Sequence, residues 1–158
     1  MNADQIISLL NKLESSLDDL SPAMRGVKEN LEQLVRTTFR LSIDPYGNRW
    51  TPLKASTLLQ RRRKGIQGSS PLFATSELFD SIKGQASANG ASVFVGTENR
   101  PAGVHQEGST SAGRGRNTTI PARPFLPIKD GEADVPESWL VEINRPIIDQ
   151  LQKIANAA

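Results

Sequence analysis

The sequence predicts an α+β fold, with an N-terminal pair of helices, a small antiparallel sheet built on one hairpin, and a C-terminal helix. Two observations lead to this prediction. Apolar residues recur at three- and four-residue steps near both ends of the chain, which indicates amphipathic helices. Near the middle, Asn89-Gly90 separates two short segments, and this dipeptide is a strong hairpin signal. The 158 residues fit a single domain, 1–158, with a helical part at 1–42, an α+β part at 43–128 and a C-terminal helix at 129–158.

The first 42 residues are predicted to form two antiparallel helices. The apolar stripe of the first helix comprises Ile6, Ile7, Leu9, Leu10 and Leu13. A break follows at residues 18–22, where Ser21 is a suitable N-cap and Pro22 suits the first helical position. The second helix is expected to run to about Leu41. Its apolar face comprises Met24, Val27, Leu31, Leu34, Val35 and Phe39.

Turn residues and short elements alternate in the next part of the chain. Residues 44–48 are dense in turn formers, and a short helix is predicted over residues 53–63. The inward-facing residues of this helix are expected to be Leu53, Leu58 and Leu59. A loop at residues 65–71 separates it from another short helix, which Thr75 is expected to cap and which runs through Ile82.

The predicted hairpin places strands at residues 82–87 and 91–96, with Asn89-Gly90 as a turn in which both residues adopt positive φ. In the second strand, Ala91, Val93 and Val95 are expected on one face, and Ser92 and Phe94 on the other. Because a two-stranded ribbon is marginal alone, it must pack on a helix or pair with another strand.

Three segments complete the chain. A short helix or turn carrying His105 is predicted at residues 101–108, and a flexible loop at residues 109–119, which are rich in Ser, Gly, Thr and Arg. Three prolines exclude a helix at residues 120–127. A final helix is predicted at residues 136–155, kinked or split near Arg145 by Pro146. Its apolar stripe comprises Trp139, Leu140, Ile143, Ile147, Leu151 and Ile154.

Composition excludes several classes of function. The absence of cysteine excludes disulfides, thiolate catalysis and cysteine-ligated metals. Only 5% of residues are aromatic, so we expect a modest core that contacts between subunits supplement. The N-terminus lacks a secretory signal and no apolar stretch approaches about 20 residues, so a soluble protein with no membrane partner is expected. The net charge of +2 argues against a nucleic-acid coat, although basic residues concentrate between Arg49 and Arg123.

A series of short motifs begins at Asp44. The motifs are Asp44-Pro45-Tyr46-Gly47-Asn48-Arg49, Trp50-Thr51-Pro52-Leu53, Ser56-Thr57-Leu58, Arg62-Arg63-Lys64-Gly65, residues 72–78, Ser81-Ile82, Val95-Gly96-Thr97, Ala102, His105-Gln106, Gly108, and Pro121-Ala122-Arg123-Pro124-Phe125-Leu126-Pro127. Their order and spacing resemble the phage virion-morphogenesis family, which includes tail-completion proteins of Mu-like and related phages. The chain departs from the family at Arg100-Pro101, where an aromatic residue is common, and at Glu107-Gly108-Ser109, where Phe-Gly-Thr is common.

The resemblance implies a structural protein rather than an enzyme. Members of the family act in tail completion or head-to-tail joining of a phage or prophage particle, through protein–protein contacts and without a cofactor. Related neck and tail-terminator proteins are α+β proteins that form rings, often hexamers. The implied partners are other tail or neck proteins and further copies of the chain, assembled in the bacterial cytoplasm and resident in the virion.

No catalytic, cofactor-binding or metal-binding residue is predicted. His105 is the only histidine, so neither a metal site nor a hydrolase triad has its remaining members. Asp44, Asp80, Glu107 and Asp130 do not form a recognisable acid/base pair. We expect His105 and Gln106 to hydrogen-bond backbone near the base of a loop, with a subunit contact as the alternative.

The candidate interface residues are therefore basic and aromatic. They comprise Trp50, Arg61, Arg62, Arg63, Lys64, His105, Gln106, Arg114, Arg116, Arg123 and Phe125. The basic run is either a solvated helix end, where positive charge complements the helix dipole, or a contact for DNA or an acidic protein. The two aromatic residues are either core or interface anchors. A non-specific DNA-binding protein of the phage neck, or a capsid-assembly factor, is the alternative function.

Overall fold

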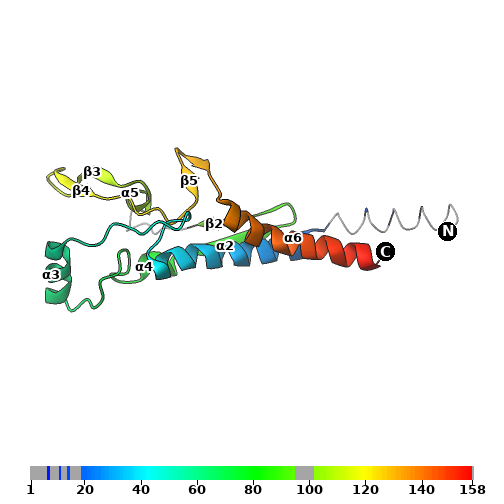
Figure 1. Ribbon diagram of the computed structural model, residues 1–158, viewed down its shortest axis with the longest axis horizontal. Coiled ribbons are helices and arrows are strands. Elements are labelled where there is room, and N and C mark those ends of the chain that lie inside the picture. The colour runs from blue at the N-terminus through cyan, green and yellow to red at the C-terminus, as the bar shows by residue number, and fades with distance from the viewer. Residues whose placement is uncertain (1–6, 8–10, 12–13, 15–18, 95–101, 158) are drawn as a thin grey trace. The chain divides into compact units, whose positions relative to one another are not determined.

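The computed structural model describes residues 7, 11, 14, 19–94 and 102–157 (Figure 1). The elements in chain order are α2 (Ser21–Leu41), α3 (Ala55–Arg63), α4 (Glu77–Asp80), β1 (Lys83–Ser87), β2 (Gly90–Phe94), α5 (Ala102–Glu107), β3 (Ser109–Ala112), β4 (Thr118–Ile120), β5 (Ile128–Lys129), β6 (Glu132–Ala133) and α6 (Glu137–Ala157). They confirm the predicted α+β class.

The chain divides into two compact units. The first, which we call the helical unit, comprises Met1–Leu31, Gly84–Val93 and Glu137–Ala158. The second, which we call the aromatic unit, comprises Glu32–Lys83 and Phe94–Pro136. Each unit is built by a different kind of contact, and each is described by itself.

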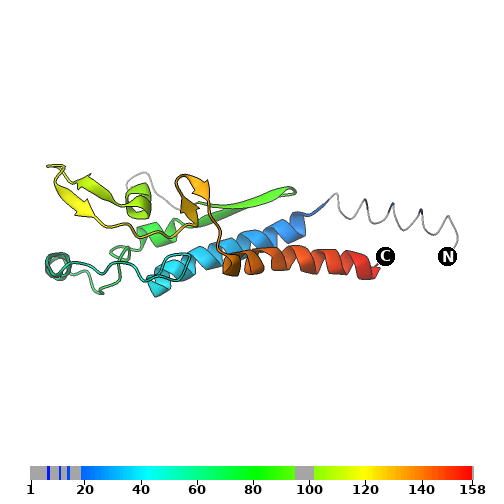
Figure 2. The same ribbon diagram turned by 45° about the horizontal axis from the view of Figure 1, so that its top comes forward.

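Aliphatic side chains hold the helical unit together. The first part of α2 lies beside α6, as the two views agree (Figure 1, Figure 2). The buried cluster comprises Ala23, Met24 and Val27, with Leu31, Ala91, Ile143 and Ile147 packed against it. These residues recur at helical steps on α2 and α6 and belong to the amphipathic faces predicted from the sequence. The predicted stripe of α6 is wrong at Leu140 and Leu151, which are exposed.

Helix α2 begins one residue earlier than predicted. The backbone N–H of Met24 donates to the carbonyl of Leu20, and the N–H of Ser21 donates to the Asp19 carboxylate at 3.0 Å. Asp19 therefore caps the helix in place of Ser21, and hydrogen bonds from the side chain and the backbone N–H of Ser21 lower the pKa of its carboxyl group. In the predicted first helix, Ile7, Asn11 and Glu14 are helical, and the other residues lie outside the described part.

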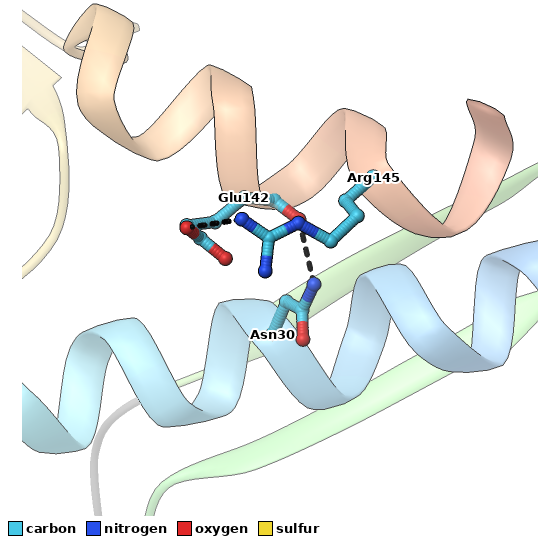
Figure 3. Close-up of polar contacts among 3 residues, drawn as sticks. All are labelled: Asn30, Glu142 and Arg145. Atoms are coloured by element: carbon cyan, nitrogen blue, oxygen red, sulfur yellow. Dashed lines mark hydrogen bonds and ion pairs between the residues drawn. The ribbon is translucent and has the colours of Figure 1, made fainter. Parts of the chain in front are cut away.

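Pro146 does not split α6, which runs through it as one helix, so the predicted split near Arg145 is wrong. A proline lacks the N–H that would bind the carbonyl four residues earlier, here that of Glu142. The side-chain amide of Asn30, on α2, donates to that carbonyl at 2.6 Å and replaces the missing helical bond (Figure 3). One turn earlier on α2, a Cβ at Gly26 would lie 2.7 Å from the Pro146 Cβ, so only glycine lets the proline ring approach.

The predicted hairpin forms, but its turn is Ala88-Asn89 rather than Asn89-Gly90. Neither Asn89 nor Gly90 adopts positive φ, so the expected turn geometry is wrong. The alternation of faces is confirmed where it is described: Ala91 and Val93 are half-buried, whereas Ser92 and Phe94 are exposed. Val95, Gly96 and Thr97 lie outside the described residues.

The aromatic unit is organised around Phe39, which is fully buried near the end of α2. Its ring centroid lies 5.6 Å from Trp50, 5.1 Å from Phe125, 6.0 Å from Phe79 and 6.4 Å from Phe73. Such edge and tilted geometries are the favourable ones for aromatic pairs. Most of the few aromatic residues in the chain are therefore concentrated in one cluster.

The two short helices of this unit differ from their predictions. Helix α3 begins at Ala55 rather than Leu53 and has no buried residue, and Leu59 is 48% exposed, so its predicted inward orientation is wrong. Helix α4 begins after Ser76 rather than at Thr75 and ends before Ile82. Ser76 adopts a left-handed conformation, which no local sequence signal indicates. The predicted turn at residues 44–48 is present, with the Asp44 carboxylate accepting the backbone N–H groups of Tyr46 and Asn48.

Residues 109–119 are not the irregular loop that was predicted. Strands β3 and β4 pair antiparallel, with Ser109 opposite Ile120 and Ala112 opposite Thr118. The segment carries almost no apolar side chain, which is typical of a loop, yet the backbone hydrogen bonds that pair two strands do not require one. A second unpredicted hairpin pairs β5 with β6 around Asp130-Gly131, both of which have positive φ.

Candidate functional site

The residues predicted as an interface all lie in the aromatic unit and separate by exposure. The buried ones are Trp50, Gln106, Arg123 and Phe125. The exposed ones are Arg62, Arg63, Lys64, Arg114 and Arg116, and the half-buried ones are Arg61 and His105. The side chains of Trp50, Gln106 and Arg123 bind the chain's own backbone. The exposed group and the two half-buried residues are the most accessible to a partner.

Helix α5 holds the Gln106 side chain against the proline-flanked segment that follows β4. Its Oε1 accepts the backbone N–H of Phe125 at 3.0 Å and of Leu126 at 3.1 Å, and its Nε2 donates to the Leu126 carbonyl at 2.8 Å. This segment is part of no helix or strand, so the glutamine supplies partners that a sheet would otherwise provide. Gln106 thus has the backbone-bonding role expected for it.

Arg123 and Trp50 link the same segment to residues 51–52. The Arg123 guanidinium donates through Nε to the Thr51 carbonyl at 2.9 Å and through Nη2 to the Pro52 carbonyl at 3.4 Å. In return, the Trp50 indole N–H donates to the Pro124 carbonyl at 2.8 Å. Two motifs that lie far apart in the sequence therefore meet, and both are used to build the fold.

A cleft of about 500 Å³ opens beside these bonds. Its lining residues are Thr51, Pro52, Leu53, Lys54, Ser56, Thr57, Arg61, Leu72, Ala74, Thr75, Glu77, Leu78, His105, Thr118, Thr119, Ile120, Pro121 and Arg123. Burial lowers the pKa of both Arg61 and Arg123, and the charge of Arg61 lowers the pKa of Arg123 further. The cleft thus gathers two of the predicted cations and the histidine.

The exposed cations lie in two places, at the C-terminal end of α3 and in the turn between β3 and β4. Arg62 and Arg63 lie in the last turn of α3 and Lys64 is its C-cap, so their charge complements the negative end of the helix dipole. Arg114 and Arg116 lie in the turn between β3 and β4, and Arg116 has positive φ. A contact between these cations and DNA or an acidic partner stays a prediction.

Sequence reasoning missed an uncovered apolar face on α6. Leu140, Val141, Ile148 and Leu151 are 42%, 57%, 50% and 42% exposed, respectively. Val141 and Ile148 lie outside the apolar stripe predicted for this helix, and that excess of aliphatic residues was the available signal. Clustered exposed aliphatic side chains are typical of protein contact surfaces.

Residues 19–94 and 102–157, with residues 7, 11 and 14, contain no group of three or more histidine, cysteine or acidic side chains placed to hold a metal ion. Among the same residues, no helix has the length and apolarity needed to cross a membrane.

These features define a class of protein. Motif residues bind the chain's own backbone, and large aliphatic and basic side chains remain on the surface, as in proteins that act through surface contacts.

Comparison with known proteins identifies the family. The family model described as "Phage virion morphogenesis family" matches residues 1–142. The chain is also 35% identical, over 137 residues, to the Mu-like prophage FluMu G protein 2 of Haemophilus influenzae, with 86% of this chain and 87% of that protein covered. No solved structure matches significantly. The chain belongs to the phage virion morphogenesis family, and its role is in the assembly of phage particles.

Proposed function

We propose that this protein completes the phage tail or joins the tail to the head, by contacts with further copies of itself and with neighbouring tail or neck proteins. Membership of the virion morphogenesis family and the similarity to a Mu-like prophage protein support a role in assembly. The observation that carries the finer proposal is the uncovered apolar face of α6.

The geometry of α6 explains why this face is suited to a second protein. At 3.6 residues per turn, Leu140, Val141, Ile148 and Leu151 fall within an arc of about 100°. The neighbouring arc, which carries Ile143 and Ile147, packs on the cluster of α2. Burying one large aliphatic side chain contributes about 1.5–3 kcal/mol. The free arc can therefore supply a substantial share of the energy of a subunit contact.

We propose that copies of the chain pack side by side through this face to form a ring, with a hexamer as the expected size. A contact between two different surfaces of one protein closes into a ring when its rotation divides a full turn. The mechanism is binding and ordering of components, with no covalent step, and the expected location is the tail or neck of the virion.

The role in the virion is tested by deleting the gene from an inducible prophage that carries it. We expect induced lysates to contain filled heads and separate tails, counted by electron microscopy, with infectivity restored by the gene in trans. Joined, infectious particles from the deletion strain would overturn the proposal.

The role of α6 is tested by light scattering across a range of protein concentrations. We expect a closed oligomer for the wild-type chain and a smaller species for Ile148→Lys, because a charge on this face cannot be buried without a partner. The matched control is Asn156→Lys, which adds the same charge to an exposed position on another face of α6. Equal masses for the two variants would remove α6 from the contact.

The alternative is a non-specific DNA contact in the neck, which the exposed Arg62, Arg63, Lys64, Arg114 and Arg116 favour. Phosphate contacts of this kind weaken steeply as salt increases. Binding of a duplex oligonucleotide that is strong at low salt and lost in a variant with these residues changed to glutamine would favour this alternative.

A further inference from the structure

The cleft of the aromatic unit has an apolar floor. Leu53, Leu72, Leu78 and Ile120 line its interior, and Leu78 is buried. Its volume of about 500 Å³ falls within the range of sites that enclose a ligand's side chains. A surface for the phosphate backbone alone would not need such a floor, so the apolar lining favours a peptide over DNA.

The charge of the cleft is unbalanced. Lys54, Arg61 and Arg123 line it with a single carboxylate, that of Glu77. Arg123 is only 6% exposed, and Arg61 donates to the Ser70 carbonyl at 2.9 Å. The hydrogen bonds described for both guanidinium groups run to backbone carbonyl oxygens.

A guanidinium carries more donors than these carbonyl bonds use, so both arginines can still bind an anion. Two cations held close together in a partly desolvated site repel one another. An anion that lies between them relieves this repulsion, so burial strengthens its contact with the guanidinium groups. Burial lowers the pKa of both side chains, and the charge of Arg61 lowers the pKa of Arg123 further. The charge therefore points to an acidic ligand.

A short strand lines part of the cleft. All of β4, Thr118–Ile120, lines the cleft, and β4 pairs with β3 in a two-stranded sheet. Its second edge has no partner strand among residues 19–94 and 102–157. An open strand edge presents N–H and C=O groups that bind an extended peptide by adding it as a further strand.

We propose that this cleft binds an extended acidic segment of a partner protein, which adds to the edge of β4 and places a carboxylate between Arg61 and Arg123. Alternate side chains of an extended peptide point to opposite faces. A segment that alternates aliphatic and acidic residues can therefore meet the apolar floor and the guanidinium groups together. This inference deepens the proposed function, and rests on it only in taking the partner to be a virion protein.

The test uses the full-length chain and a short blocked peptide of alternating valine and glutamate, labelled for fluorescence anisotropy. We expect it to bind about tenfold more tightly than the same peptide with glutamine for glutamate, because the charged contact is lost. Equal affinity for the two peptides, or no binding of either, would overturn the proposal.

Two variants locate the site. Arg61→Gln is expected to weaken binding about tenfold, whereas the matched control Arg63→Gln, on the same helix and outside the cleft, leaves it unchanged. Ser56→Trp, at an exposed lining position, is expected to block binding by filling the cleft, with circular dichroism used to verify folding. Full binding by both Arg61→Gln and Ser56→Trp would overturn the proposal, as would displacement of the peptide by duplex DNA in an Arg61-dependent manner.

The failure of this inference is distinguishable from the failure of the proposed function. If wild-type protein restores joined particles but Arg61→Gln does so equally and no acidic peptide binds, the cleft proposal is wrong and the assembly role stands. If the deletion strain makes joined particles, the assembly role is wrong whatever the peptide measurements give.

Discussion

The two units of this chain are stabilised in different ways. In the helical unit, aliphatic side chains of α2 and α6 pack on one another, and the described hydrogen bond between the two helices runs from Asn30 to the Glu142 carbonyl. In the aromatic unit, rings surround Phe39, and side chains bind distant backbone groups. Examples are the bonds of Trp50 and Arg123.

This difference explains which side chains of each unit are used within the fold and which remain exposed. The motifs that identify the family lie largely in the aromatic unit, and their aromatic, amide and guanidinium groups are used to hold irregular segments in place. The helical unit needs only one arc of α6 for its core, so Leu140, Val141, Ile148 and Leu151 remain exposed. Several motif residues therefore build the fold, whereas an excess of aliphatic residues marks the surface that we propose for protein contacts.

The largest expected effect is that of Gln106→Leu, which tests the role of side-chain-to-backbone bonds in the aromatic unit. The change keeps the volume but leaves the N–H groups of Phe125 and Leu126 and one carbonyl without partners. Buried groups left unsatisfied cost about 1–3 kcal/mol each, so we expect the free energy of unfolding to fall by about 3 kcal/mol. Urea denaturation measures this change.

The control for this prediction is the adjacent Glu107→Leu, at an exposed position of the same helix. Substitutions at such positions usually change stability by about 0.5 kcal/mol or less. Hydrogen exchange gives a second readout, because the amides of Phe125 and Leu126 should lose protection in the Gln106 variant alone. If both variants are equally stable, the Gln106 side chain does not stabilise the segment that contains Phe125 and Leu126.

A smaller effect is expected in the helical unit from Asn30→Ala. The loss of its amide leaves the Glu142 carbonyl unpaired beside Pro146, and we expect a cost of about 1 kcal/mol. In a Pro146→Ala background, the restored N–H of residue 146 can bind that carbonyl. The same Asn30→Ala substitution should then cost close to nothing.

A thermodynamic cycle of the two single variants and the double variant, each unfolded in urea, gives this coupling energy directly. A coupling near zero would show that Asn30 does not replace the missing helical bond. Such a result would leave packing alone as the explanation of an unbroken α6.

The long elements of both units were predictable from the sequence because their apolar periodicity is strong. Helix α2 ends at Leu41 as predicted, and α6 spans Glu137–Ala157 where residues 136–155 were predicted. The sequence rules for turns predicted the observed turns less well. Asn89-Gly90 predicted a hairpin that forms with another turn, whereas Asp130-Gly131 has the positive φ values that the rule requires and was overlooked. Composition was misleading at β3 and β4, where backbone pairing needs no apolar pattern.

The site was less predictable than the fold. Residue type indicated that Trp50, Gln106, Arg123 and Phe125 matter, but not that they are buried, because their partners come from segments distant in sequence. The approach of Arg61 to Arg123 likewise depends on how α3 lies against the segment after β4. No local pattern contains this information.

The smallest effect concerns Tyr46, which ties the turn at residues 44–48 to Asp134 within the aromatic unit. The hydroxyl donates to the Asp134 carboxylate at 2.7 Å, and this hydrogen bond is the main cause that raises the pKa of Tyr46 to about 12. Because the folded pKa lies above the ordinary value of about 10, the contribution of this bond to stability is fully present below pH 10. It is lost as the pH rises through about 12.

The chain has a single tyrosine, so ultraviolet titration of tyrosinate reports this group alone. We expect Asp134→Asn to move the titration down toward 10, because both the hydrogen bond to the carboxylate and its negative charge are removed. Asp130→Asn, in the turn of the neighbouring hairpin, removes the same charge and should leave the titration in place. A wild-type titration midpoint near pH 10 would mean that the hydrogen bond from Tyr46 to Asp134 is weak. Side-chain hydrogen bonds at the exposed edge of the aromatic unit would then stabilise it less than the buried ones do. The contrast between the two units would then hold for the buried tethers of Gln106, Trp50 and Arg123, and not for the surface.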